Sequence, residues 1–260
     1  MSNPLIIAHR GASFDAPENT LAAFHLAFAQ GADGIEADFR LSSDGEIVCI
    51  HDAMTGRTAE RNLRVATHSL AELRGLDFGG WRGPQWQGEK IPTLAEVLTI
   101  LPTGKKFFIE IKCGVEIISP LHKLLTTTAT ATEQLCFLTF DALLLAALKG
   151  AFPTIKSCLN VEYHRTGLVG AWQPSAEELV RILSHCGAAG LSSQAHRCID
   201  ADFIERLRSS GNELHIWTVD FLADARHYHA LGVDSLMSNR PGFLRQELLA
   251  ASLWSPLAGR

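Results

Sequence analysis

The chain carries the segments IIAHRGASFDAPENT and GIEADFRLSSDGEIVCIHD at the two ends of residues 6–52. His9 and His51 bracket this stretch, and two acids, Glu36 and Asp38, lie between them. Each of the four falls at or near the end of a short apolar run, where a β-strand is expected to end. The stretch therefore predicts that two histidines and two carboxylates gather at the ends of neighbouring strands.

Along the whole chain, short β-rich apolar runs alternate with longer helical patterns. Eight core strands are expected, each followed by a helix, at residues 5–8, 34–41, 106–111, 134–139, 155–161, 189–192, 213–219 and 233–237. A further β run, 46–51, pairs back on the second strand through the turn Ser42–Gly45. Eight β–α units in roughly 250 residues predict a TIM (β/α)8 barrel. The competing open doubly wound sheet lacks a G-x-G-x-x-G after its first strand.

The helical patterns fall between these strands. The first is expected to begin near Asn19-Thr20 and to end at Gly31. The others are expected at residues 93–101, 116–131, 141–150, 175–186, 200–210, 222–231 and from Pro241 to about Leu253. The alternation breaks from about residue 53 to 92, a stretch rich in Gly, Arg and Trp with a helical period only at Ser69–Leu73. We interpret it as a small insertion after the strand-two hairpin, within one barrel domain of residues 1–260.

Composition narrows the class of protein. A net charge of −5, from 23 basic and 28 acidic side chains, argues against nucleic acid or an anionic membrane as the main partner, but not against a small anionic substrate. The six cysteines include no C-x-x-C pair and are interpreted as buried thiols in a reducing compartment. Neither a signal peptide nor an apolar run long enough to span a membrane is recognised. The sequence predicts a soluble cytoplasmic monomer or homodimer.

The acidic residues indicate a metal site. In a barrel the active site lies at the carboxyl ends of the strands, and residues two apart on a strand point to the same face. Glu36 and Asp38 therefore point inward together, as do Glu110 and Lys112 on the next strand. Three inward carboxylates without a cysteine form an all-oxygen cage, which favours Mg²⁺ or Ca²⁺ over zinc. The alternative is an ordinary salt bridge between Glu110 and Lys112 or Arg10.

The remaining candidates surround these acids. His9 and His51 are suited to acid–base work, one taking a proton and the other delivering it. Arg10 and Lys112 offer the positive charge that a phosphate needs. Trp217, at the end of the seventh strand, is either core or an apolar wall for a substrate. Two further motifs have simpler interpretations. Pro17-Glu18-Asn19-Thr20 reads as a helix N-terminus, and Asn239-Arg240-Pro241 as a turn before a helix.

Taken together, these motifs resemble those of the glycerophosphodiester phosphodiesterases. The matching residues, in the family's order, are His9-Arg10-Gly11, Pro17-Glu18-Asn19-Thr20, Glu36-x-Asp38, Asp44-Gly45 with Val48, His51-Asp52, Glu110-Ile111-Lys112, Trp217-Thr218-Val219, Gly232-Val233-Asp234 and Asn239-Arg240-Pro241. Each motif alone is weak, but the ordered set spans nearly the whole chain and is specific.

The resemblance implies a TIM barrel that hydrolyses glycerophosphodiesters to sn-glycerol 3-phosphate and an alcohol. It implies that Glu36, Asp38 and Glu110 bind Mg²⁺ or Ca²⁺, that His9 and His51 are the general base and general acid in either order, and that Arg10 and Lys112 hold the phosphate. The nucleophile is water or the glycerol 2-hydroxyl. One alternative is lysophospholipase D or phospholipase C-like action on lipid phosphodiesters, with Trp81 and Trp86 as an apolar rim. Another is a non-catalytic barrel that binds a glycerophospho ligand.

Overall fold

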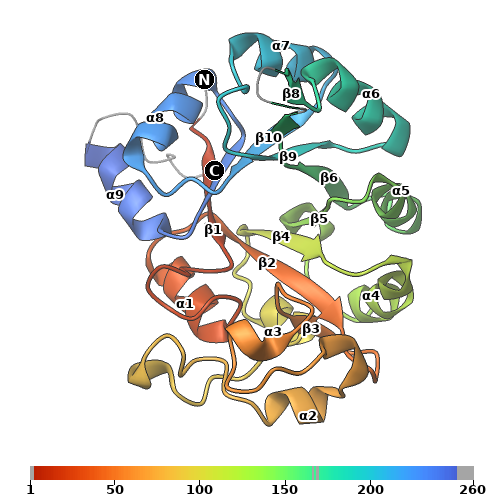
Figure 1. Cartoon of the computed structure of the whole chain (residues 1–260), viewed down its shortest axis with the longest axis vertical. Coiled ribbons are helices and arrows are strands. Elements are labelled where there is room, and N and C mark those ends of the chain that lie inside the picture. The colour runs from red at the N-terminus through yellow and green to blue at the C-terminus, as the bar shows by residue number, and fades with distance from the viewer. Residues whose placement is uncertain (1–2, 166, 168–169, 251–260) are drawn as a thin grey trace.

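The computed structural model describes residues 3–165, 167 and 170–250, in which eight parallel strands close into a barrel. The ring runs β1, β2, β4, β5, β6, β9, β10, β11, and β1 closes it by pairing with both β2 and β11. Their bounds are Leu5–His9, Gly34–Leu41, Lys106–Ile111, Leu135–Thr139, Lys156–Val161, Gly190–Gln194, Glu213–Trp217 and Ser235–Ser238. Helices surround the ring (Figure 1). The TIM barrel predicted from the sequence is confirmed.

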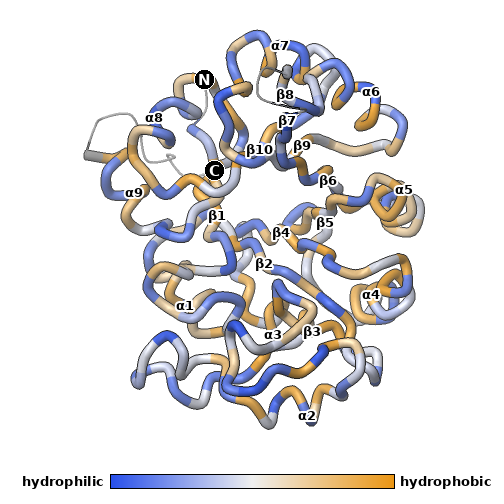
Figure 2. Tube along the Cα trace, viewed as in Figure 1, coloured by the Kyte–Doolittle hydropathy of each residue, from blue (hydrophilic) through white to orange (hydrophobic). Residues whose placement is uncertain are grey.

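The surrounding helices are α1 Leu21–Ala29, α3 Leu94–Thr99, α4 Ile118–Leu125, α5 Ala142–Ala151, α6 Ala176–Cys186, α7 Ala201–Ser209, α8 Leu222–Leu231 and α9 Pro241–Ala250. Helices α4, α6 and α7 are clearly amphipathic, and hydrophobic and hydrophilic residues both occur along the ring of helices (Figure 2). Capping boxes fix the starts of α3 and α6, where Thr93 pairs with Glu96 and Ser175 with Glu178. Within the described residues, no helix combines the length and the apolar character that crossing a membrane requires.

Strand alternation divides the core into an outer and an inner part. Ile35, Ala37 and Phe39 of β2 pack outward against helix residues such as Phe24 and Val97. The opposite faces of the strands fill the barrel interior with a small apolar cluster of Ile7, Phe108, Cys136, Leu138, Cys158 and Met237. Inward positions beyond this cluster, towards the carboxyl ends of the strands, are polar and are described in the next subsection. The predicted inward direction of the β2 and β4 acids follows from this alternation.

The segment after the β2 hairpin is short of regular structure. Strand β3, Ile47–Cys49, pairs antiparallel with the end of β2. The chain then forms short 3₁₀ turns and one helix, α2, Leu70–Arg74. This segment lies at one side of the barrel, beside α3 (Figure 1). It has an apolar cluster of its own, in which residues of the β3 strand and of the segment pack together: Val48, Ile50, Ala59, Val65, Leu73, Leu76, Phe78 and Ile91.

Three details differ from the sequence-based expectations. The helix predicted at 116–131 ends at Leu125, because the hydroxyls of Thr126 and Thr127 bond to backbone carbonyls of the preceding turn and compete with helix continuation. The strand predicted at 46–51 is confined to β3. A small hairpin of β7, His164–Arg165, and β8, Trp172–Gln173, was not predicted. The expected end of the last helix, 251–253, lies outside the described residues.

Candidate active site

Three carboxylates meet inside the barrel near the carboxyl ends of β2 and β4. The register pairs Asp38 of β2 with Glu110 of β4, and Glu36 lies one inward position earlier. One oxygen from each of the three lies within 4.8 Å of the others. The residues are 1%, 1% and 7% exposed for Glu36, Asp38 and Glu110. The structure thus brings together the three acids that the sequence placed on two separate strands.

The three carboxyl groups of this cluster differ in the direction of their pKa shifts. Burial raises the pKa of Glu36 well above its usual range, and the charges of Asp38 and Glu110 add to the effect. Burial, followed by the charge of Asp38, likewise raises the pKa of Glu110 to about 7. For Asp38, burial acts in the same direction, but the positive charges of Arg10 and Lys112 outweigh it and lower its pKa. Without a further cation, Glu36 and Glu110 therefore tend to hold protons.

Two basic side chains contact the cluster from opposite sides. Arg10 Nε lies 3.2 Å from Asp38 Oδ2. Lys112 Nζ lies 3.3 Å from Asp38 Oδ1 and pairs with Glu110 Oε1. The salt bridge considered as an alternative to a metal site is therefore present, and two positive charges face three carboxylates. One negative charge is left without a basic partner in this group.

The unbalanced group is Glu36, and its surroundings fit a cation. Its Oε2 accepts a hydrogen bond from the backbone N–H of Arg10 at 3.0 Å. Its Oε1 is buried and has no hydrogen-bond partner among the described residues. A buried carboxylate oxygen without a donor is unfavourable unless a cation or a proton meets it. The all-oxygen donor set formed with Asp38 and Glu110 suits a hard divalent ion.

His9, at the end of β1, is held in one orientation. Its Nδ1 lies 2.8 Å from Asn239 Oδ1, and Asn239 Nδ2 donates to Asp220 Oδ2 at 2.7 Å. Because Asn239 uses its amide nitrogen on Asp220, its oxygen accepts from His9 Nδ1–H. The lone pair of His9 is then on Nε2, 3.9 Å from Glu36 Oε2. Burial, assisted by Arg10, lowers the pKa of His9 to about 4, so its ring is neutral near pH 7.

His51 lies on the other side of the cluster and is paired with an acid. Its Nδ1 is 2.7 Å from Asp52 Oδ1, and Asp52 Oδ2 accepts from Arg57 Nε at 2.5 Å. The carboxylate of Asp52 therefore fixes the orientation of the His51 ring. Arg40 ties this loop to the barrel, because its guanidinium donates to the carbonyls of both His51 and Lys112.

Most of the residues proposed from the sequence line one cavity of about 290 Å³ at this end of the barrel. The lining residues are His9, Arg10, Glu36, His51, Glu110, Lys112, Leu138, Phe140, Glu162, Ser192, Trp217 and Met237. Asp38 lies behind this surface, in contact with Arg10 and Lys112. Trp217 packs edge-on against Phe140, with ring centroids 5.9 Å apart, and forms an apolar wall. Trp81 and Trp86 are not part of the lining.

Loop residues that were read as helix starts and turns also support the site. Asn19 holds Asp38 at two points, donating from Nδ2 to Oδ2 at 2.9 Å and accepting from the Asp38 N–H at 3.2 Å. Glu18 accepts from Arg10 Nη1 at 3.0 Å. Asp220 was not singled out at all, although it positions Asn239. For Glu18 and Asn19, the sequence did contain a signal: the Pro17–Thr20 motif follows soon after His9-Arg10-Gly11, at the end of the first strand.

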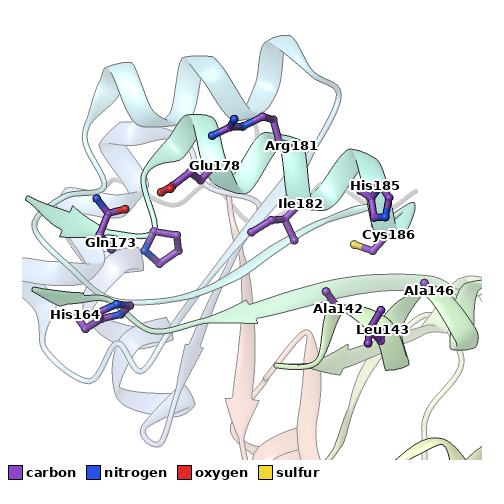
Figure 3. Close-up of a pocket in the computed structure, with 11 residues that line it drawn as sticks. Ala142, Leu143, Ala146, His164, Gln173, Glu178, Arg181, Ile182, His185 and Cys186 are labelled. Carbon is purple, nitrogen blue, oxygen red and sulfur yellow. The ribbon is translucent and has the colours of Figure 1, made fainter. Parts of the chain in front are cut away.

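A larger cavity, of about 920 Å³, lies outside the barrel between α5, α6 and the small hairpin. Figure 3 shows Leu143, Ala142 and Ala146 on α5 facing the α6 residues Ile182, His185 and Cys186 across it. None of the three clustered carboxylates lines this larger cavity, so the cavity is not the candidate catalytic centre. Its lining residues Leu143 and His164 are close in sequence to Phe140 and Glu162, which line the catalytic cavity.

The model of the glycerophosphoryl diester phosphodiesterase family matches residues 9–243. A glycerophosphodiester phosphodiesterase of Caldanaerobacter subterraneus subsp. tengcongensis is 33% identical over 243 residues, covering 91% of this chain and 94% of the relative. A solved Oleispira antarctica phosphodiesterase in complex with the product sn-glycerol-3-phosphate is 31% identical, with a TM-score of 0.85 and coverage of 95% of this chain and 97% of that one. A glycerophosphodiester phosphodiesterase of Agrobacterium tumefaciens is 26% identical, with a TM-score of 0.77 and coverage of 95% and 100%.

Proposed function

The chain belongs to the glycerophosphoryl diester phosphodiesterase family and is a phosphoric diester hydrolase, and we propose that it converts glycerophosphodiesters to sn-glycerol 3-phosphate and an alcohol. The observation that carries the proposal is the buried cluster of Glu36, Asp38 and Glu110, flanked by His9 and His51 in one cavity. The similar enzyme of Oleispira antarctica, solved with sn-glycerol-3-phosphate, supports the product assignment.

We propose that Glu36, Asp38 and Glu110 hold Mg²⁺ or Ca²⁺. When bound, such an ion polarises a phosphoryl oxygen and stabilises the negative charge that develops on it. Arg10 and Lys112 line the same cavity and supply further donors for the phosphate oxygens. The wall formed by Trp217 and Phe140 faces the less polar part of the substrate and excludes water.

The two histidines take different roles in the proposal. His9 is neutral near pH 7 and keeps the lone pair on Nε2, so it accepts the proton of the attacking hydroxyl. His51, whose other ring nitrogen is paired with Asp52, delivers a proton to the oxygen of the departing alcohol. Both proton transfers take place in the same cavity, which His9 enters from the end of β1 and His51 from the loop after β3.

We also infer that residues 1–260 form one domain and that the segment 53–92 is an insertion in it. Its apolar cluster is shared with Val48 and Ile50 of the barrel's own hairpin region, so the segment packs onto the barrel. All six cysteines are free thiols, which supports a reducing, cytoplasmic location, and a small glycerophosphodiester is the expected partner of the monomer or homodimer.

The proposed reaction is tested with a panel of glycerophosphodiesters, each assayed for release of glycerol 3-phosphate. We expect turnover with Mg²⁺ or Ca²⁺, complete loss after treatment with EDTA, and recovery when either ion is added back. Since the buried carboxylates would otherwise retain protons, the metal-free protein should also gain thermal stability when the ion is added. An unchanged rate in EDTA would contradict the metal assignment, and the absence of glycerol 3-phosphate would contradict the product.

Binding of the cation is expected to depend on pH. Glu110, whose pKa is raised to about 7, must lose its proton to act as a ligand. Protonated Glu110 stabilises the metal-free fold, and this stabilisation is lost as the pH rises towards and through 7, while cation binding strengthens. Below pH 7 the apparent dissociation constant should rise by a factor that approaches about tenfold per pH unit. Calorimetric titrations at pH 6, 7 and 8 measure it. Glu110→Gln should bind more weakly with a shallower slope, and equal affinity at all three pH values would refute the expectation.

A second candidate activity, on lysophospholipids, is favoured by the groove between α5 and α6 (Figure 3). Its apolar wall includes Leu143, which is 81% exposed and lies three residues along the chain from Phe140 of the catalytic cavity. An acyl chain leaving the cavity past Phe140 would cover this surface. The tryptophans of the insertion, proposed from the sequence as the apolar rim, do not lie in either lining.

Substitution of Leu143 separates the two activities. Leu143→Glu should lower kcat/KM for lysophosphatidylcholine about tenfold, the equivalent of one or two methylene groups left in water. Turnover of glycerophosphocholine, which has no acyl chain, should be unchanged. The matched control is Leu249→Glu, an exposed leucine on α9. Equal effects on both substrates, or none on the lipid, would exclude the groove as an acyl site.

A further inference from the structure

A second group of potential ligands lies at the opposite end of the barrel interior. Cys136 is the second residue of β5 and Cys158 the third of β6, while Glu213 and His215 are the first and third residues of β10. This group lies on the amino-terminal side of the catalytic cavity, since Trp217, which lines that cavity, comes two residues after His215 on β10. Nothing in the proposed hydrolysis uses it.

Three members of this group lie close enough together to share one metal ion, and Cys136 joins them through its contact with Cys158. One ligand atom each from Cys158, Glu213 and His215 lies within 4.8 Å of the other two. His215 Nε2 is 3.6 Å from Glu213 Oε2. The sulfurs of Cys136 and Cys158 are 3.7 Å apart. Two thiolates bound at about 2.3 Å to one tetrahedral zinc ion are about 3.8 Å apart, so the two sulfurs already have the spacing of a zinc pair.

His215 has the surroundings of a metal-binding histidine. It is 4% exposed, and its ring packs edge-on against Phe108. Its Nδ1 pairs with Ser235 Oγ at 2.9 Å, which fixes the orientation of the ring. Its Nε2 is buried, has no hydrogen-bond partner among the described residues, and faces Cys158 and Glu213. A histidine ligand usually donates from one ring nitrogen to a neighbour and coordinates through the other.

We propose that Cys158, His215 and Glu213, with Cys136 as the fourth ligand, bind one zinc-class divalent ion at the amino-terminal end of the barrel. Sulfur and imidazole donors select zinc or a chemically similar transition metal over Mg²⁺ and Ca²⁺. The side chain of Glu213 is 32% exposed, so an ion can reach the group from solvent. Its other oxygen pairs with Lys156, which orients the carboxylate.

In the absence of an ion, Cys136 contacts Cys158, and Glu213 lies between His215 and Lys156. The neighbouring Cys136 thiol and burial raise the pKa of Cys158 well above its usual range. Burial opposes the charge of His215, but Cys158 and Glu213 outweigh it and raise its pKa to about 9. Metal binding therefore releases protons from the thiols and the imidazole. The resulting ion would join strands β5, β6 and β10 from inside and stabilise the fold.

Cobalt(II) titration of the whole chain tests the proposal. The protein is first saturated with Mg²⁺ to fill the carboxylate cluster, and a phosphine reductant keeps the thiols reduced. We expect one equivalent of Co²⁺ to give a sulfur-to-cobalt charge-transfer band and intense visible bands of tetrahedral geometry, both reversed by zinc. The all-oxygen cluster contains no sulfur and cannot produce the charge-transfer band, so the result is independent of the proposed hydrolysis.

Variants assign the ligands. Cys158→Ser and His215→Ala should lose the band, while Cys136→Ser and Glu213→Gln should retain it at reduced intensity or affinity. Cys186→Ser, a buried cysteine on α6, is the control and should titrate like the original chain. Circular dichroism confirms that each variant is folded, and the partly exposed position of Glu213 makes its variant the least disruptive. Absence of the band in the folded parent, its persistence in Cys158→Ser, or a stable Cys136–Cys158 disulfide in its place would overturn the proposal.

Discussion

Replacement of His9 by alanine is expected to lower kcat on glycerophosphocholine by about 10² to 10⁴-fold, the usual contribution of a positioned general base. The reason is geometric as well as electrostatic. Asn239 holds Nδ1 of the ring, so Nε2 is left to accept a proton, and burial keeps the ring neutral near pH 7. The measurement is steady-state turnover at saturating cation. His25→Ala, which removes an exposed histidine from α1, is the matched control and should keep the parental rate.

A substrate with an acidic leaving group distinguishes the two histidines. A p-nitrophenyl diester releases a phenolate that needs no proton at neutral pH, so general acid catalysis is dispensable for it. His51→Ala should therefore regain most of the parental rate on this substrate, whereas His9→Ala should remain impaired on both. Recovery of His9→Ala in place of His51→Ala would reverse the assigned roles. Near-normal turnover of glycerophosphocholine by either variant would remove that residue from the acid–base pair.

Glu36→Gln should lower the activity but raise the thermal stability of the metal-free protein. The substitution keeps the side chain's shape but removes the charge, and kcat/KM should fall on the order of 10³-fold because several kcal/mol of cation-dependent stabilisation are lost. In EDTA, however, the variant should melt at a higher temperature than the parent. The amide oxygen of glutamine can still accept from the Arg10 N–H, while the free energy needed to keep the buried carboxyl protonated at neutral pH is no longer spent.

Thermal melts in EDTA and in saturating Mg²⁺, together with the activity assay, measure both effects. Glu116→Gln is the control, since Glu116 is an exposed acid after β4 whose loss should affect neither quantity. Full activity in Glu36→Gln would exclude this residue as a ligand. A lower melting temperature in EDTA would mean that the carboxylate stabilises the metal-free fold, contrary to its raised pKa.

Strand periodicity explains why much of the fold and of the candidate site was predictable. An inward Glu36 requires an inward Asp38, and the same rule applies to Glu110 and Lys112. Parallel strands then bring their carboxyl ends together without further information. The eight strands were placed within about two residues for the same reason, because each has a buried run bounded by turn residues.

The parts that were not predicted depend on contacts between distant loops. Asn19 and Asp220 have no periodic signal, and their roles exist only after the barrel closes and brings them to Asp38 and Asn239. The early end of α4 depends on threonine hydroxyls competing for carbonyls, which an apolar pattern does not record. Cys136 and His215 lie on strands that are not neighbours in the ring, with no spacing that resembles a metal-binding motif.

The bond between His9 and Asn239 joins residues 230 positions apart, across the seam where the first strand meets the last. A nascent chain on the ribosome therefore carries the metal-binding acids long before it can orient His9. At about 5–20 residues per second, the interval between synthesis of the two residues is roughly ten to fifty seconds. Under the proposed mechanism, the site is completed only with the final β–α unit, so a truncated translation product would retain most of the proposed catalytic side chains and yet lack an oriented base.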